Sequence, residues 1–134
     1  MRRLIALFAF LAVAACGGDS ATNSLSSSIA GTYTLRSVNG AVLPYVEVVD
    51  NFKLELLSQT LTLTEGGSFN TQGTIRTTVN TQVSTTNFSD TGTYTRSGNA
   101  LTLRTTSDSS TVTGTIAGGS LTVLADRLTY VFQK

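Results

Sequence analysis

Apolar side chains recur at every second position in most segments of the chain after residue 30. Clear examples are the pairs Tyr33 and Leu35, Leu61 and Leu63. A spacing of two is typical of β-strands that bury one face. The positions between them are often threonine, which is β-branched yet polar and therefore suits a hydrated sheet face. The pattern predicts one strand after another.

Short segments rich in Gly, Asn, Asp and Ser separate these runs, as at Asn39-Gly40 and Ser97-Gly98-Asn99. Such intervals are short enough for hairpins, so consecutive strands are expected to pair antiparallel. Residues 43–49 are ambiguous because Pro44 lacks a backbone donor, and they fit either an edge strand or a brief turn of helix.

The expected fold class is all-β. A meander of about eight strands removes its two edges by closing into an antiparallel up-and-down barrel, and a two-sheet β-sandwich is the alternative. The side chains that face inward in such a barrel either fill it or line a pocket for one small ligand. The short domain favours the filled interior, and both readings stay open.

The N-terminus has a different pattern. Arg2 and Arg3 precede an apolar run over residues 4–15, which is shorter than the roughly 20 residues that a membrane-spanning helix needs. The run is typical of a secretory signal, and its end, Val13-Ala14-Ala15-Cys16, resembles the lipobox of bacterial lipoproteins. The alternative is an ordinary signal, cleaved after Ala14, with an incidental cysteine.

The lipobox resemblance implies that residues 1–15 are removed and that Cys16 carries acyl chains that hold the protein in a membrane. Residues 16–28 would then be the lipidated cysteine with a Gly- and Ser-rich flexible tether, and residues 29–134 the barrel domain. Gly17 stands where aspartate commonly retains such lipoproteins at the inner membrane. The resemblance therefore implies the outer membrane of a bacterial envelope.

The composition limits the kinds of catalytic, metal and nucleic-acid-binding sites that the chain can form. The 134 residues include no His and one Cys, which excludes nucleophiles activated by histidine and zinc sites built from Cys and His. The carboxylates lie mostly at predicted turns and form no motif, so we expect no enzyme, no cofactor and no metal. Without residues 1–15 the formal side-chain charge changes from +1 to −1, so nucleic acid is not an expected partner. We expect a monomer.

A family resemblance rests on several motifs in the strand region. They are Gly31-Thr32-Tyr33-Thr34-Leu35, residues 90–94 (DTGTY), residues 97–103 (SGNALTL) and residues 128–132 (LTYVF). Together they resemble small bacterial lipoproteins with a lipocalin-like domain, over nearly all of residues 29–134. The resemblance implies a compact barrel, and the larger lipocalins bind small apolar ligands.

Five residues are candidates for a binding site. Tyr33, Tyr94 and Tyr130 have the inward parity, and Arg96 shares the parity of Tyr94, so a cation near the barrel rim would meet the carboxylate of an apolar ligand. The alternative for Arg96 is a solvated strand end. Phe88 stands in residues 80–90 (NTQVSTTNFSD), which we expect to be a loop, and is the candidate anchor for a protein partner. The alternative is that Phe88 folds back and caps the barrel.

Overall fold

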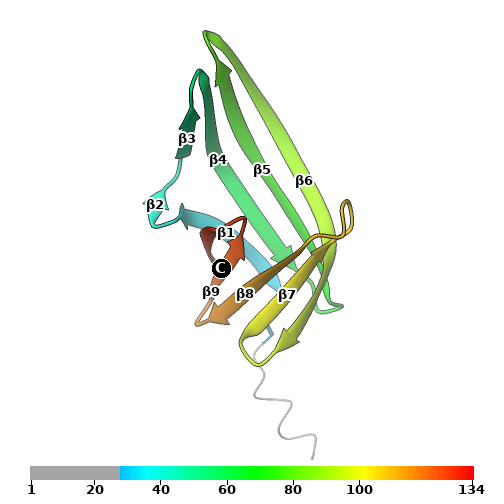
Figure 1. Cartoon of the computed structure of the whole chain (residues 1–134). Coiled ribbons are helices and arrows are strands. Elements are labelled where there is room, and N and C mark those ends of the chain that lie inside the picture. Colours follow the sequence, from blue (N-terminus) through cyan, green and yellow to red (C-terminus); the bar gives the residue numbers. More distant parts are fainter. Residues whose placement is uncertain (1–27) are drawn as a thin grey trace, which may run out of the picture.

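The computed structural model describes residues 28–134, and the regular elements there are all β-strands. The predicted signal peptide, Cys16 and most of the tether lie outside the described residues. The strands are β1 (Gly31–Val38), β2 (Ala41–Val42), β3 (Tyr45–Val49), β4 (Phe52–Leu63), β5 (Ser68–Val79), β6 (Gln82–Ser97), β7 (Ala100–Thr105), β8 (Thr111–Ala117), β9 (Ser120–Ala125) and β10 (Leu128–Gln133) (Figure 1). No helix in this part of the chain is long and apolar enough to span a membrane.

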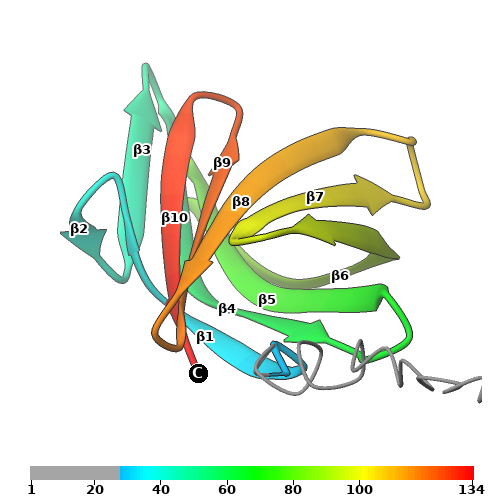
Figure 2. The same cartoon turned by 90° about the horizontal axis from the view of Figure 1, so that it is seen from below.

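Eight of the strands form a closed antiparallel barrel. Strands β4 to β10 follow one another around the wall, β10 pairs with β1, and β1 closes the ring by pairing with β4 (Figure 2). The short β2 lies beside β1, and β3 lies beside β4. The predicted up-and-down barrel is confirmed and the sandwich is excluded, because the pairing of β1 with β4 joins the edges that an open meander would leave free.

One end of the barrel is closed by packed side chains. Tyr33, Leu63, Leu101 and Leu121 are at most 1% exposed there. These residues come from β1, β4, β7 and β9, so they converge from around the whole wall. Burial of apolar surface stabilises the fold by roughly 25 cal/mol per Å², and most of the fully buried side chains of the core lie at this end.

A one-residue bulge in β4 brings both halves of this strand into the same core. The pairing of β4 with β5 shifts between Leu56 and Ser58. Leu56 and Leu61 are five positions apart, so in a regular strand they would face opposite sides of the sheet. Both are buried instead, because the extra residue of a bulge changes which positions face inward.

Strand β6 is 16 residues long and includes the segment that the sequence assigned to a loop. That prediction is wrong, since only Asn80 and Thr81 form the turn and residues 82–90 pair with β5. The segment contains Val83, Thr85 and Thr86, whose β-branched side chains favour extended backbone, and every position has a partner on β5. The pairing of β6 with β7 covers only residues 92–97.

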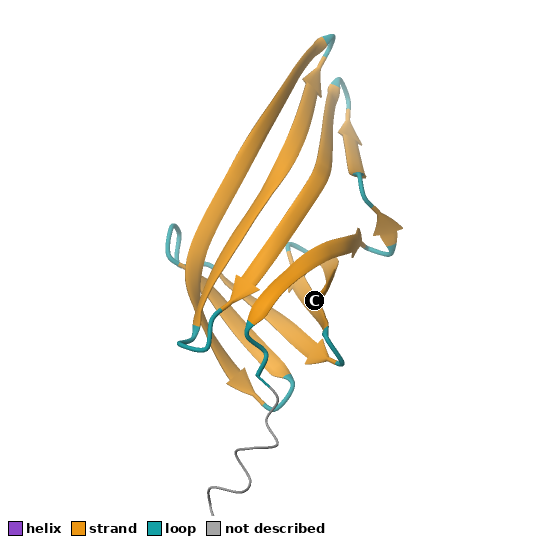
Figure 3. Ribbon diagram, turned by 180° about the vertical axis from the view of Figure 1, so that it is seen from behind, coloured by secondary structure: helices purple, strands orange, loops and turns teal. Residues whose placement is uncertain are grey.

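The upper parts of β3, β4, β5 and β6 project beyond the rest of the wall (Figures 1 and 3). The ambiguous residues 43–49 contribute β3, which begins just after a cis Leu43-Pro44 bond and pairs with β4 alone. The edge-strand reading of this segment is therefore correct, and Pro44 precedes the strand. The projecting strands form one tall side of the open end.

Candidate functional site

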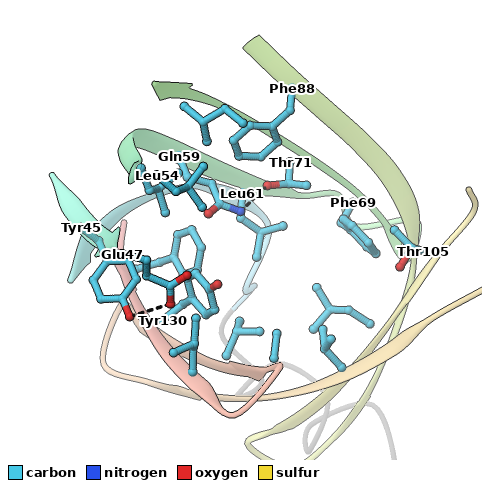
Figure 4. A pocket seen from close by; sticks show the side chains of 18 residues that line it. Tyr45, Glu47, Leu54, Gln59, Leu61, Phe69, Thr71, Phe88, Thr105 and Tyr130 are labelled. Atoms are coloured by element: carbon cyan, nitrogen blue, oxygen red, sulfur yellow. Dashed lines mark hydrogen bonds between the residues drawn. The ribbon is translucent and has the colours of Figure 1, made fainter. Parts of the chain in front are cut away.

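The open end of the barrel contains a cavity of about 370 Å³, which lies in the lower part of the range of small-molecule sites. Side chains from β3 to β10 surround it (Figure 4). The lining residues are Tyr45, Glu47, Leu54, Leu56, Gln59, Leu61, Phe69, Thr71, Ile75, Phe88, Leu103, Thr105, Val112, Val123, Ala125, Leu128, Tyr130 and Phe132. The barrel is thus packed at one end and hollow at the other, and neither sequence reading alone describes it.

Two aromatic rings line the cavity over glycines on the neighbouring strands. Phe88 of β6 lies against Gly73 of β5, where an added methyl group would come within 2.6 Å of the ring. Phe69 of β5 lies against Gly92 of β6 in the same way. A glycine leaves room for the ring to lie flat on the sheet, so each pair gives a smooth apolar wall.

Five of the six polar side chains of the cavity gather at two places, and the sixth, Thr105, donates a hydrogen bond to the carbonyl oxygen of Ser110 at 3.1 Å. Gln59 donates a hydrogen bond to the hydroxyl of Thr71 at 3.0 Å, and that hydroxyl donates to the carbonyl oxygen of Thr60, also at 3.0 Å. These groups satisfy one another within the wall. The second place is on β3 and β10, where Tyr45, Glu47 and Tyr130 lie together (Figure 4).

Tyr45 donates a hydrogen bond to Glu47 Oε1 at 3.1 Å. Burial raises the pKa of Tyr45, and the hydrogen bond to Glu47 and the charge of Glu47 raise it further. Burial likewise raises the pKa of Tyr130, with smaller contributions from the carboxylates of Asp126 and Glu47. Both phenols therefore stay protonated at neutral pH, and the single O–H of Tyr45 is already used in its hydrogen bond to Glu47.

The structure brings one of the four predicted ligand-binding residues to the cavity. Tyr130 lines it, whereas Tyr33 is buried in the closed end and donates a hydrogen bond to the Ile29 carbonyl at 2.6 Å. Tyr94 donates to the carbonyl of Thr64, and Arg96 donates to that of Gly98 at 2.7 Å. Tyr94 and Arg96 line a separate hollow of about 280 Å³ beside Ser28, where the described chain begins.

Arg96 accordingly lies at the end of the barrel opposite the cavity mouth. Arg96 and Tyr94 are two positions apart and lie on the same side of β6. The direction of β6 places both residues toward the closed end of the barrel. A ligand carboxylate in the cavity would not reach this guanidinium.

Phe88 is half-buried and contributes its ring to the cavity wall. It stands on a paired strand, so it does not project from a loop. This placement matches the alternative in which the ring folds back onto the barrel.

Tyr45 and Glu47 are the functional candidates that the sequence did not single out. Because Pro44 makes the segment that contains them ambiguous, its alternation gave no prediction of a site. Tyr45 and Glu47 have one parity, and Val46 and Val48 have the other. Reading that alternation as a strand puts Tyr45 and Glu47 on one face, but the rule that apolar residues face inward would have chosen the two valines, which the structure leaves exposed.

Among residues 28–134 there is no cluster of three or more Asp, Glu, Cys or His side chains suited to a metal ion. The buried carboxylate, Glu55, lies on the outer face of β4 and is paired with Arg76 and Lys53 at 2.7 and 3.1 Å. It belongs to the wall and not to the cavity.

The sequence matches no family model, and no curated protein is significantly similar to it. The observed barrel is compatible with a lipocalin-like fold.

Proposed function

We propose that this protein is a lipid-anchored protein of a bacterial envelope whose barrel binds one small apolar ligand in the cavity at its open end. The observation that carries the proposal is the contrast between the two ends of the barrel. Tyr33, Leu101 and Leu121 fill the closed end, while the open end keeps about 370 Å³ with a mostly apolar lining. A barrel of eight strands has room for its own side chains or for one small ligand. In this barrel, side chains fill the closed end, and the open end has room for a ligand.

The position of Ser28, the last residue of the predicted tether, supports the same reading. Ser28, where the described chain begins, donates a hydrogen bond to Glu65 on the turn between β4 and β5 at the closed end. An anchor on Cys16 would therefore join the barrel at the end opposite the cavity mouth. The mouth would stay accessible while the protein is held at the membrane.

A cavity-filling substitution tests ligand binding. Ala125 lines the cavity from β9, so Ala125→Phe would occupy the space that a ligand needs. Ala117→Phe is the matched control, because Ala117 is exposed at the other end of the barrel. The full chain is purified from a bacterial envelope into lipid nanodiscs, and native mass spectrometry with organic extraction detects bound molecules.

We expect an extractable ligand with the parent chain and with Ala117→Phe, and none with Ala125→Phe. The same extra mass on all three proteins, or no extra mass on any of them combined with no uptake from a lipid extract, would overturn the proposal.

The anchor has its own test. Mass spectrometry of the mature N-terminus should find Cys16 as the first residue, with a diacylglyceryl group on its sulfur. Cys16→Ser should lose the lipid and leave the membrane fraction. A mature chain that begins at Ala15 with an unmodified cysteine would contradict lipidation and support the ordinary signal.

A further inference from the structure

The cavity carries one sign of charge. Of the 18 residues that line it, Glu47 is the charged one, and no lysine or arginine is among them. Arg96, the cation expected to meet a ligand carboxylate, lies at the closed end. A fatty acid in this cavity would bring its carboxylate toward that of Glu47, which is exposed to solvent, and the two like charges would repel each other.

The surroundings of Glu47 are suited to a positive group. Its carboxylate lies beside the phenol of Tyr45, which donates to Oε1, and near Tyr130 on the facing strand β10 (Figure 4). Aromatic rings attract a cation over their faces, and a carboxylate forms charge-assisted hydrogen bonds with an ammonium group. Asp126, on the turn before β10, adds a second negative charge near Tyr130, and its neighbour Arg127 is exposed on the same turn.

The rest of the lining is suited to a hydrocarbon. Leu54, Leu56, Ile75 and Phe88 continue from this polar corner into the cavity. At the roughly 30 Å³ that a water molecule occupies in the liquid, the cavity holds about a dozen non-hydrogen atoms. An alkyl chain of about ten carbons with a small head group is of this size.

We propose that the ligand of this cavity is a protonated alkylamine, whose ammonium group binds Glu47 between Tyr45 and Tyr130 and whose chain lies along the apolar wall. The inference rests on the proposed binding function and names its ligand class. It reverses the charge preference that the sequence suggested, because Arg96 is remote from the cavity and Glu47 belongs to it.

Three probes of equal chain length test the charge preference: decylamine, decanol and decanoate. Each is titrated by calorimetry at pH 7 into the full chain in lipid nanodiscs. The Ala125→Phe protein in the same nanodiscs is the blank for partition into lipid. We expect decylamine to bind at least about tenfold more tightly than decanoate, with decanol between them.

Glu47→Gln isolates the carboxylate. The amide oxygen of glutamine still accepts a hydrogen bond from Tyr45, so the corner keeps its shape while it loses its charge. We expect this variant to bind decylamine no better than decanol. Glu65→Gln removes a carboxylate at the closed end as the matched control and should keep the preference of the parent.

The outcomes distinguish an error in the ligand class from an error in the proposed binding function. If the three probes bind equally, or if Glu47→Gln keeps the amine preference, the ligand class is wrong while binding in the cavity stands. If the heats of all three probes are the same with the parent and with Ala125→Phe, both the ligand class and the binding function are overturned. A circular dichroism spectrum of each variant shows whether the barrel has folded.

Discussion

The ring of Phe88 on β6 lies against Gly73 on β5, and the two residues face each other directly in the strand register. An ideal methyl group on Gly73 would come within 2.6 Å of Phe88 Cζ and would also meet the backbone carbonyl oxygen of Ser58. To admit the methyl group, either the ring must shift or the backbone of β4 must move away from β5, which pairs with it here. This contact therefore fixes the wall of the cavity at the height of the β4 bulge.

Gly73→Ala should destabilise the barrel by about 1–3 kcal/mol, the usual cost of overpacking a fitted site. The measurement is the midpoint of urea unfolding followed by circular dichroism. Gly66→Ala is the control, because a methyl group there meets only the Thr64 hydroxyl, at 3.9 Å. Equal midpoints for the two variants would show that β4 and β5 separate easily at this point.

Tyr33 and Tyr94 stand in two copies of the sequence Gly-Thr-Tyr-Thr, at residues 31–34 and 92–95, yet changing each tyrosine should lower the free energy of unfolding by a different amount. Tyr33→Phe removes a buried hydrogen bond to the Ile29 carbonyl and should cost about 1–3 kcal/mol. Tyr94→Phe should cost less, about 0.5–1.5 kcal/mol, because the Thr64 carbonyl keeps a hydrogen bond from the Gly67 amide. Urea unfolding of both variants measures the difference, and a larger loss for Tyr94→Phe would contradict this assignment.

Acid should weaken the barrel through Glu55. Hydrogen bonds from Arg76 and Lys53 lower the pKa of Glu55 from 4.5 to about 2. Since the pKa is lower in the folded chain, the charged form stabilises the fold fully above pH 4.5, and this contribution is lost as the pH falls toward 2.

Unfolding midpoints of the parent and of Glu55→Gln between pH 7 and pH 2 test this expectation. The variant should be less stable at pH 7 and should depend less on pH between about 4.5 and 2. Glu65→Gln, at an exposed turn, should follow the parent. Parallel pH curves for the parent and Glu55→Gln would rule out a stabilising role of this ion pair.

The two ends of the barrel should respond differently to truncation. Leu121 is fully buried in the packed end, so Leu121→Ala should cost about 2–5 kcal/mol. Leu54 already faces the empty cavity, so Leu54→Ala should cost less than about 2 kcal/mol. Equal losses in unfolding free energy would mean that the open end collapses onto itself in solution.

The sequence by itself determined the strands and most of the core. The alternation of apolar residues with threonine is a local property of extended backbone, and it placed Tyr33, Leu101 and Leu121 correctly on the inner face. The turns at Asn39-Gly40 and Ser97-Gly98-Asn99 ordered these strands antiparallel. The cost of free edges favoured closure over a two-sheet sandwich, and the pairing of β1 with β4 decided between them.

Tertiary structure alone decided which end of the barrel is hollow. Tyr94 and Tyr130 both have inward parity, yet one lies near the packed end and the other lines the cavity, because depth along the barrel depends on strand direction and register. Glu47 joins the cavity because β3 is added beside β4 after the cis Leu43-Pro44 bond. A period of two specifies the face of a sheet, whereas the position along the barrel axis, and with it the charge of the cavity, depends on pairing between distant segments.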